Sequence, residues 1–510
     1  MCGTIPNVRK RKENPGRSRS AVATRRPTPR GPRQSQRRYK IFRDPIHDHI
    51  VFEGPEIDLL PLVDSRAFQR LRRIHQNGAA FLAYHGLERS RFSHGLGTYE
   101  AARRFASALV RAARDKKSAM GPFFPNETAL MGFKAACLAH DIGHPCFSHA
   151  GERFFQRLVP SQRTQDVRHE SWTARIVEED EEVKKVLSRM SWAEDMRAFI
   201  HGFPPHPLTY LQRFHSGSLD VDRLDYLLRD SQACGVGYGS ADFPWLLQTM
   251  NVELVGMGWE TPHWEIVFDG AKAGYAIEQF LLARRSMYSQ VYFHKTARAS
   301  EALLLALLLR ALHIGRFVGG SQSQRSTRLP AAFGTLAAGA KTSVESYLAL
   351  DDHVVLSCAV DWAYRERDPV LRDLANRLIR RRLFKAIPLP EAKRGLLKDD
   401  RAIEELRELV DRQPDLPKPA RSSGERASDY YLATDENRVE LYESALGSIW
   451  LRHTDPGGQI RIVPFEADPR RIGFKFVKGA SDSFMSVSFV IVPEVCEREA
   501  RRLVEKWDEG

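Results

Sequence analysis

The chain has 510 residues, of which 42% are hydrophobic and 28% charged, an ordinary composition for a globular protein of two or three domains. Its formal net charge of +13 is typical of a nucleic-acid binder, but residues 1–40 hold thirteen Lys or Arg and one Glu, so they carry +12 and leave +1 for the rest. This distribution excludes a generally basic surface on the folded body.

Residues 1–39 are predicted to form a disordered basic tail. They are rich in Arg, Pro, Ser and Gln and have almost no large apolar side chains, so they cannot bury enough surface to offset the entropy of ordering. We interpret the tail first as a solvated leader. An arm that binds the phosphates of single-stranded nucleic acid is the second interpretation. A transit peptide ranks last, because prolines interrupt any amphipathic helix.

Residues 40–314 are predicted to be mostly helical and to form the core domain. The segment 65–78 reads as a helix that stops at a glycine, and the segment 127–143 as a helix that begins after a cap at Asn126. The segment 278–312 reads as one or two long helices. Its most apolar part contains Arg310 and is too short to span a bilayer, so we expect a core helix and no membrane partner.

Residues 315–412 are predicted to be a loop followed by a helical extension of the core, and residues 425–510 a smaller α+β domain. The last region contains four short β-like runs, at 447–454, 459–465, 472–477 and 483–492, and then a helix. The fold class is therefore mainly α. Six scattered cysteines without a CxxC pair fit a reducing cytoplasm, which is the expected location.

The segment CLAHDIGHPCFSH, from Cys137 to His149, crowds three histidines and an aspartate behind an apolar helix. Adjacent helical residues point about 100° apart, so His140 and Asp141 can reach one ion only at the helix end. A histidine that is hydrogen-bonded inside a packed core is the alternative explanation of this dipeptide alone.

Two further segments supply partners for these residues. His94 is expected at the start of a helix, three residues after Arg91. If the segment SGSLDVDRLDYLLRDSQACGVGYG is helical, it aligns Asp222, Tyr226 and Asp230 on one face. A solvated face explains that last helix equally well.

Together, two imidazoles and two carboxylates from three helices suit a divalent ion of Mn, Fe, Zn or Mg: His94, His140, Asp141 and Asp222. His144, His149 and His169 are expected to line the same pocket, because an imidazole near neutral pKa can move a proton. Glu152, one turn beyond His149, could orient a histidine.

The motifs RFSH, HDIGHPCFSHAGE, HE and DVDRLDY resemble, in this order, those of the HD-domain phosphohydrolases. More narrowly they resemble the deoxynucleoside triphosphate triphosphohydrolases, such as the bacterial dGTPase and the SAM- and HD-domain dNTPase. The likeness extends from Lys40 to Ile387. It implies a mostly helical homo-oligomer (a dimer, tetramer or hexamer) that uses a divalent metal to hydrolyse a dNTP to the deoxynucleoside and inorganic triphosphate.

The resemblance also implies a role for each matching position. The metal ligands would be His94, His140, Asp141 and Asp222. Proton transfer would fall to His149, His169 and Glu152. The triphosphate would be held by Arg91, His144, Arg223 and Lys295. The 3′-hydroxyl would be held by Gln76 and Asp230, the sugar would stack on Tyr226, and the sugar and base would lie near Arg284, Tyr292 and His294.

A regulatory guanine-nucleotide site between subunits is a further implication, with a guanine nucleotide as activator. Its matching positions are Lys40, His49, Asp64, Gln69 and Arg72. An amphipathic helix whose arginines pair with surface carboxylates explains the segment FQRLRRI as well. Two positions depart from the pattern: Asn77 stands where Leu is usual beside the base, and Arg43 stands where the regulated enzyme has Asn.

Two alternatives to a dNTP triphosphohydrolase remain. One is an HD-superfamily phosphohydrolase of another class, such as a phosphodiesterase, nuclease or nucleotidase, because the superfamily shares the metal ligands. The other is a nucleic-acid-binding protein without catalytic activity that uses the basic tail. The predicted ligand set argues against a pure binder, which does not need it.

Overall fold

The computed structural model describes residues 39–202, 208–256, 262–320, 326–420, 423–440, 442, 448–470 and 484–507. Residues Met1–Arg38 form a separate unit, and every element below belongs to the unit Tyr39–Gly510. Apart from Tyr39, the predicted basic tail lies outside the described residues. The strand predicted at 472–477 lies outside them as well.

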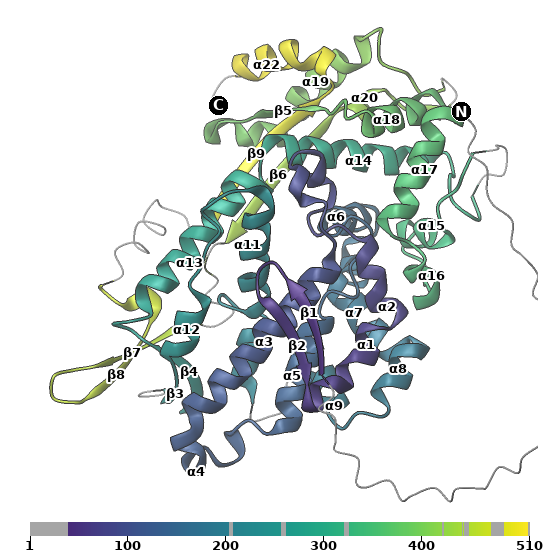
Figure 1. The fold of residues 1–510 in the computed structure, drawn as a ribbon. Helices are drawn as coiled ribbons and strands as arrows, with labels where there is room; N and C mark the ends of the chain where they lie inside the picture. Colours follow the sequence, from purple (N-terminus) through teal and green to yellow (C-terminus); the bar gives the residue numbers. More distant parts are fainter. Residues whose placement is uncertain are drawn as a thin grey trace, which may run out of the picture. The chain divides into compact units, whose positions relative to one another are not determined.

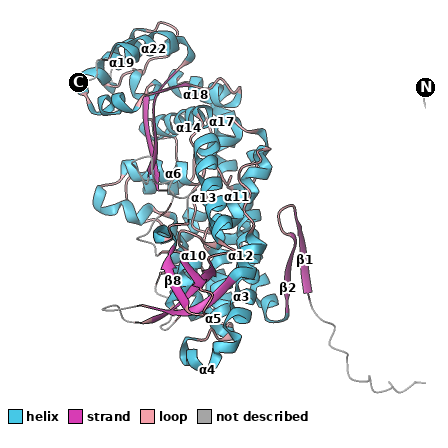
Figure 2. Ribbon diagram, turned by 90° about the vertical axis from the view of Figure 1, so that its left-hand side faces the viewer, coloured by secondary structure: helices cyan, strands magenta, loops and turns pink. Residues whose placement is uncertain are grey.

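The fold is mainly α, as predicted (Figure 1, Figure 2). The helices up to the middle of the chain are α1 (Leu60–Val63), α2 (Arg66–Arg70), α3 (Arg91–Ala113), α4 (Lys117–Met120), α5 (Glu127–Ala139), α6 (His149–Leu158), α7 (His169–Glu179), α8 (Glu181–Leu187), α9 (Ala193–Ile200), α10 (Gln212–His215), α11 (Val221–Cys234) and α12 (Phe243–Thr249). The later helices are α13 (Gly274–Met287), α14 (Lys295–His313), α15 (Ala331–Ala337), α16 (Val344–Leu348), α17 (Asp352–Arg365), α18 (Pro369–Ile379), α19 (Asp400–Arg412), α20 (Ser428–Tyr431) and α22 (Glu497–Lys506).

Helix α3 packs against both α5 and α11, and these three helices carry or precede the segments that the sequence singled out. The cap predicted at Asn126 is present, since its side chain accepts from Ala129 N at 2.8 Å. Helix α5 ends at Ala139, earlier than the predicted Gly143, and leaves His140 and Asp141 in the turn that follows. Helix α11 is capped by Asp220 and ends at Gly235, which has a φ of 69°.

Gly97 explains how α11 comes so close to α3. A Cβ atom at this position would lie 2.0 Å from Asp225 Oδ1 and 2.2 Å from Arg229 Nη2. Any larger residue would therefore push the charged side chains of α11 away from α3. Gly97 thus leaves space for a buried polar contact between the two helices.

Three small sheets accompany the helices. The strands are β1 (Tyr39–Asp44), β2 (Asp48–Glu53), β3 (Met250–Val255), β4 (His263–Asp269), β5 (Lys385–Pro388), β6 (Ala433–Glu440), β7 (Trp450–Thr454), β8 (Ile460–Pro464) and β9 (Phe484–Val492). The sheet orders are β1-β2, β3-β4-β7-β8 and β5-β9-β6. All neighbours are antiparallel except β4 and β7, which are parallel.

The hairpin β1–β2 was not expected, because the segment from Tyr39 was predicted to be mostly helical. The structure turns the chain between Asp44 and Asp48, where Asp44 Oδ1 accepts from the backbone of Ile46 and His47 at 2.9 and 3.0 Å. Pro45 within this turn has no N–H to donate to a helix. Local side-chain hydrogen bonds therefore favour the hairpin over a helix.

The strands of the last eighty residues pair with strands from two earlier parts of the chain. Strand β7 lies beside β4, and β9 lies beside β5 as well as β6. The boundaries predicted at 315, 412 and 425 remain a proposal. Helix α14 is buried over much of its length, and Arg310 on it pairs with Asp368 and Glu425. Among the described residues, no helix is both long enough and apolar enough to cross a bilayer.

Candidate active site

A cavity of about 560 Å³, here called the central cavity, collects most of the predicted site residues. Those that line it are Gln76, Arg91, His140, Asp141, His144, His149, His169, Asp222, Arg223, Tyr226, Asp230, Arg284 and Tyr292. His94 lies buried behind the wall, with its ring 5.2 Å from that of His140. Glu152 is also buried, behind His149 and His169.

The first group of ligating atoms joins α3, α11 and the turn that follows α5. Asp222 Oδ1 lies 2.8 Å from His94 Nε2 and 3.6 Å from His140 Nε2. Asp141 completes the group, since its carboxylate lies 3.6 Å from His94 Nε2 and 3.3 Å from His140 Nε2. Neither Nε2 atom makes a hydrogen bond with any described residue. We call these four residues the HHDD group.

The other nitrogen of each ring decides what the Nε2 atoms can do. His94 Nδ1 lies 2.7 Å from Asp225 Oδ2, and His140 Nδ1 lies 2.8 Å from the carbonyl oxygen of Cys137. A carboxylate and a carbonyl can only accept, so each Nδ1 carries the hydrogen. Both Nε2 atoms then present lone pairs toward the carboxylates of Asp141 and Asp222. Imidazole nitrogens that face carboxylates in this way bind either a proton or a metal cation, and His94 Nε2 lies close enough to Asp222 for a charged hydrogen bond.

Charged residues around the HHDD group shift the pKa values of His94 and Asp141. Burial lowers the pKa of His94, but Asp222 and Asp225 outweigh burial and raise it to about 10. Burial raises the pKa of Asp141, but Arg91, His140 and His144 outweigh burial and hold it well below its usual range. The site therefore favours one added positive charge and two ionised carboxylates. A divalent metal ion can take the place of the added proton, because the two neutral imidazoles and two carboxylates then supply four donor atoms.

A second group lies beside the first and consists of His144, His149, Glu152 and His169. Glu152 Oε2 lies 2.8 Å from His169 Nδ1 and 3.5 Å from His149 Nδ1. The rings of His144 and His169 stack with centroids 3.9 Å apart. Burial raises the pKa of Glu152, but the two histidines outweigh it and lower the pKa far below the usual value. We call these residues the histidine group; they too are close enough to share a metal ion.

A strained turn places His149 at the beginning of α6. Phe147 and Ser148 both have a φ of 57°, which is uncommon for residues with a side chain. Ser148 Oγ accepts from Arg91 Nε at 2.7 Å and donates to the carbonyl of His75, and Asp352 accepts from Phe147 N. Such strain is typical of functional sites, where neighbouring contacts hold it.

The opposite wall of the central cavity is aromatic and polar. Tyr292 donates to Asp230 Oδ2 at 2.8 Å, and Arg89 pairs with the other oxygen of that carboxylate. Tyr292 ends a π-helical turn that starts at Tyr288, a local geometry that is frequent at functional sites. Gln76 Oε1 and Asn77 Nδ2 are buried here without a hydrogen-bond partner among the described residues. A polar ligand would satisfy them.

Two predicted substrate residues do not line the central cavity. His294 caps α14 through its ring, which accepts from Thr296 N at 3.2 Å. Lys295, the first residue of α14, is exposed. Their predicted contacts with substrate remain proposals.

The five predicted regulatory residues lie in two separate regions of the chain. Lys40 and His49 are exposed on the hairpin β1–β2, and Asp64, Gln69 and Arg72 lie at or near α1 and α2. Arg72 donates to Gln69 at 2.8 Å and lies 3.5 Å from the ring centroid of Phe92. These contacts within the chain also fit the alternative explanation, in which the helix needs no nucleotide.

Several residues at the site were missed by sequence reasoning. Asp225 holds His94, Arg89 holds Asp230, and His215 lines the central cavity with its Nε2 buried and without a hydrogen-bond partner among the described residues. Strand β6 adds Asn437, Arg438 and Val439 to the wall. Asp225 could have been found, because it follows Asp222 by three residues and shares its side of the helix. No local pattern marks the contribution of β6.

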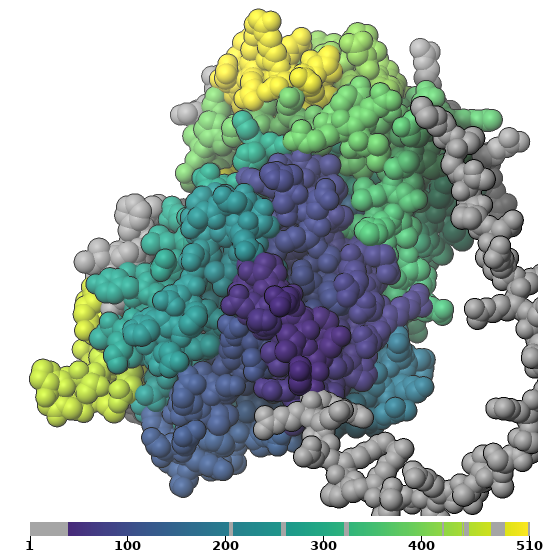
Figure 3. All heavy atoms as spheres, viewed as in Figure 1, coloured from purple at the N-terminus to yellow at the C-terminus, as the bar shows by residue number. Residues whose placement is uncertain are grey.

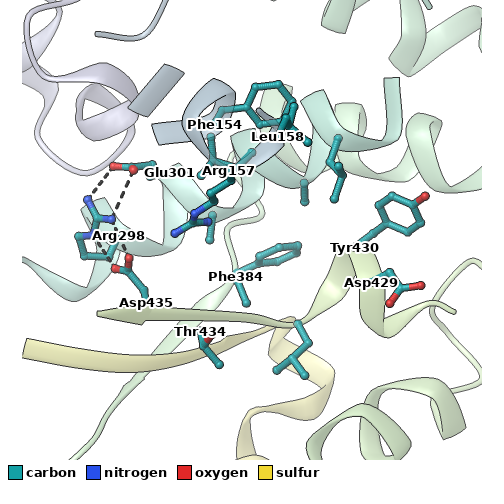
Figure 4. Close-up of a pocket in the computed structure, with 16 residues that line it drawn as sticks. Phe154, Arg157, Leu158, Arg298, Glu301, Phe384, Asp429, Tyr430, Thr434 and Asp435 are labelled. Carbon is teal, nitrogen blue, oxygen red and sulfur yellow. Dashed lines mark hydrogen bonds and ion pairs between the residues drawn. The ribbon is translucent and has the colours of Figure 1, made fainter. Parts of the chain in front are cut away.

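A second cavity, also of about 560 Å³, adjoins the first and shares Arg298 and Glu301 with it (Figure 4). Its walls are largely apolar and include Phe154 and Phe384. Arg298 donates to Asp435 at 2.7 and 2.9 Å and to Glu301 at 2.7 Å, so these three buried charges pair with one another. We call this space the second cavity.

Comparison with known proteins agrees with this architecture. Residues 91–230 match the HD domain family. The Bacillus subtilis protein YwfO is 32% identical over 359 residues, which are 68% of this chain and 72% of that protein. A phosphohydrolase from Bacteroides thetaiotaomicron has a similar crystal structure, with a TM-score of 0.65, 26% identity, and coverage of 90% of this chain and all of that one.

Two animal proteins named deoxynucleoside triphosphate triphosphohydrolase SAMHD1 are more distant. The Mus musculus protein is 29% identical over 39% of this chain, and the Gallus gallus protein 24% identical over 72%. This chain spans 32% and 59% of their lengths.

Proposed function

The chain belongs to the HD-domain phosphohydrolases, and we propose that it hydrolyses deoxynucleoside triphosphates to the deoxynucleoside and inorganic triphosphate. The observation that carries the proposal is the HHDD group. His94, His140 and Asp222 bring three ligating atoms close enough for one ion, and Asp141 lies next to both imidazoles, in a cavity whose other walls hold arginines and tyrosines. The relatives named as dNTP triphosphohydrolases support the choice of substrate.

The HHDD group would hold a divalent ion of Mn, Fe, Zn or Mg. Such an ion supplies positive charge that stabilises the phosphate oxygens of the transition state and activates a water for attack. The arginines in the wall of the central cavity would stabilise the same negative charge on the phosphate oxygens. Arg91 is fixed by Asp141 and Ser148 at the junction of the two histidine-containing groups, and Arg223 and Arg284 line the cavity on the side of α11 and α13.

The histidine group would return a proton to the leaving 5′ oxygen. Glu152 accepts from Nδ1 of His169, so the ring is held in one orientation with Nε2 free for exchange. His149 is the more exposed of the two, and its side chain retains 59% of its accessible surface. Burial lowers the pKa of His149 and the hydrogen bond with Glu152 raises it, and the net pKa lies below the ordinary value, so this ring is suited to exchange a proton rather than to keep one.

Sugar recognition would fall to the wall around Tyr226. This ring lies 6.5 Å from the His94 ring and 6.2 Å from the Tyr292 ring, so it bridges the metal side and the Asp230 side of the central cavity. Asp230 and Gln76 would hold the 3′-hydroxyl, and the Tyr226 ring would fill the space of a 2′-hydroxyl. The protein is therefore expected to prefer dNTPs to rNTPs.

The test is a chromatographic assay of each dNTP and rNTP with Mn²⁺, with and without GTP. Release of deoxynucleoside and triphosphate from dNTPs, with much slower release from rNTPs, is expected. Equal rates for GTP and dGTP, or release of monophosphate, would move the protein to another phosphohydrolase class. The arm with GTP tests the guanine-nucleotide site at Lys40, His49, Asp64, Gln69 and Arg72.

Two proposals from the sequence stand beside this one. The protein is expected to form a homo-oligomer, and residues 1–39 to contact single-stranded nucleic acid if they are more than a leader. Light scattering on the full chain tests the first. A salt titration of single-stranded DNA binding with and without residues 1–38 tests the second, because release of counterions makes such binding fall steeply with salt.

A further inference from the structure

A continuous line of buried contacts joins the hairpin β1–β2 to the metal ligand His94. His47, in the turn of the hairpin, places Nε2 2.8 Å from Asp225 Oδ1. The other oxygen of Asp225 lies 2.7 Å from His94 Nδ1. The hairpin itself lies at the surface of the face shown in Figure 3, where its residues are dark purple. One carboxylate thus separates a surface turn from the proposed metal centre.

Arg229 forms a second connection between the same elements. Its guanidinium donates to both oxygens of Asp225 at 2.9 and 2.8 Å, and to both oxygens of Asp44 at 2.7 and 3.2 Å. Asp44 in turn accepts the two backbone hydrogens that shape the hairpin turn. Asp225 therefore has four hydrogen bonds, two of them from Arg229, and no freedom to rotate away from His94.

All the members of this line are buried. Asp225 is 0% exposed, Arg229 3%, His47 5% and Asp44 9%. Gly97 leaves the space in which Asp225 and Arg229 approach α3. In such surroundings a carboxylate without its donors would be costly, so removal of any one member disturbs the others.

We propose that His47 and Asp225 are positioning residues of the metal centre, through which the turn of the hairpin β1–β2 fixes the orientation and tautomer of His94 and so sets the affinity for the metal. Partners behind a ligating histidine typically change metal affinity by about 10- to 100-fold. By reciprocity, metal binding at His94 stabilises the hairpin turn to the same degree. The inference rests on the metal site of the proposed function.

The experiment compares Mn²⁺ binding by the full-length metal-free protein and three variants, using electron paramagnetic resonance of free Mn²⁺. His47→Ala removes the donor to Asp225 and is expected to weaken binding about 10- to 100-fold. His47→Gln keeps an N–H donor at nearly the same place and is expected to restore most of the affinity. Asp48→Asn is the matched control, since Asp48 is exposed on the same turn and Asn tolerates its φ of 62°.

A spectroscopic signature separates positioning from loss of fold. The visible absorption bands of the Co²⁺-substituted protein should shift in His47→Ala and return in His47→Gln, while the far-ultraviolet circular dichroism of all metal-free variants stays the same. Unchanged Mn²⁺ affinity and unchanged Co²⁺ bands in His47→Ala would overturn the inference. Equal weakening in His47→Ala and His47→Gln with unaltered bands would overturn it as well.

A measurement without any substitution covers the case in which His47→Ala does not fold. Hydrogen exchange of the backbone amides of Ile46 and His47 should slow about 10- to 100-fold when Mn²⁺ is added to the unsubstituted protein. If Mn²⁺ binds but the exchange rates of these two amides do not change, only the coupling between the hairpin turn and the metal site is refuted. Absence of any binding of Mn²⁺, Zn²⁺ or Fe²⁺ would refute the metal site, and the proposed function with it.

Discussion

The central cavity and the second cavity have the same volume, about 560 Å³, and share Arg298 and Glu301, yet they differ in chemistry. The charges at their common wall pair with one another, and the rest of the second cavity is mostly apolar. In the wall of the central cavity, buried polar atoms of His140, His215 and Gln76 lack hydrogen-bond partners among the described residues. Volume therefore does not identify the active site. Buried polar atoms that lack a hydrogen-bond partner among the described residues identify it instead.

The largest expected effect separates the two cavities most clearly. His140→Ala should lower dNTP hydrolysis by about a thousandfold or more, because a metal supplies several kcal/mol of transition-state stabilisation. Bound metal, measured by atomic emission, should fall in parallel while the circular dichroism stays the same. A metal-depleted His140→Ala protein with full activity would contradict the assignment.

Within the central cavity, the two histidine-containing groups should behave differently. His169→Gln is expected to reduce kcat by about 10²- to 10⁴-fold, the usual contribution of general acid–base catalysis. Its metal content should stay that of the unsubstituted protein, because the HHDD group is intact. Loss of the metal in this variant would indicate that the histidine group is itself a metal site.

Removing the ion pairs between the two cavities is expected to change the free energy of unfolding rather than the rate of hydrolysis. Burial raises the pKa of Glu301, but Arg298 and Arg153 outweigh burial and lower it to about 2. The folded pKa lies below the usual value of 4.5, so this stabilisation is present above about pH 4.5 and is lost as pH falls toward 2.

Glu301→Gln should accordingly lower the free energy of unfolding at pH 7 by up to about 3 kcal/mol. The same substitution should flatten the loss of stability between pH 4.5 and 2. Urea unfolding at several pH values measures both. An equally steep acid dependence in Glu301→Gln would assign it to other carboxylates, of which Glu366 has a pKa also lowered to about 2.

A smaller effect is expected where the base would lie. Asn77 has a buried Nδ2 without a hydrogen-bond partner among the described residues, so Asn77→Leu removes one donor from the central cavity. The ratio of kcat/KM between two dNTPs should change by about 3- to 10-fold, the value of one hydrogen bond. Identical ratios for all four dNTPs in both proteins would place Asn77 away from the base.

The smallest effect is expected from a substitution in the wall of the second cavity. Ala306→Leu adds apolar volume to its wall and should leave dNTP hydrolysis within about twofold and stability within about 1.5 kcal/mol. Steady-state kinetics and thermal unfolding provide the two values. A tenfold loss of activity would show that the second cavity communicates with the central one.

Sequence reasoning predicted the helices that carry the HHDD group because the signals there are local. The cap at Asn126, the apolar run that follows it and the spacing of Asp222, Tyr226 and Asp230 all act within a few turns of helix. Most predicted residues consequently line the central cavity or lie directly behind it. Their roles stay predictions until variants are measured.

Contacts between residues far apart in the chain could not be predicted from the sequence. Strand β6, which lines the central cavity, pairs with β9, and His47 reaches Asp225 across 178 positions of the chain. Neither contact leaves a local pattern, because each joins segments that are far apart in the sequence. His294 and Lys295 match the motif but do not line the central cavity, and their contacts with substrate stay predictions.

The pairing of β6 with β9 also has a consequence for how the protein is made. Synthesis proceeds from the N-terminus at about 5–20 residues per second, so Asp222, the last of the proposed metal ligands, leaves the ribosome well before β9 exists. During that interval the nascent chain has its ligands but lacks the β6 wall of the central cavity. The β6 wall is therefore added to the central cavity only after all four residues of the HHDD group have been synthesised.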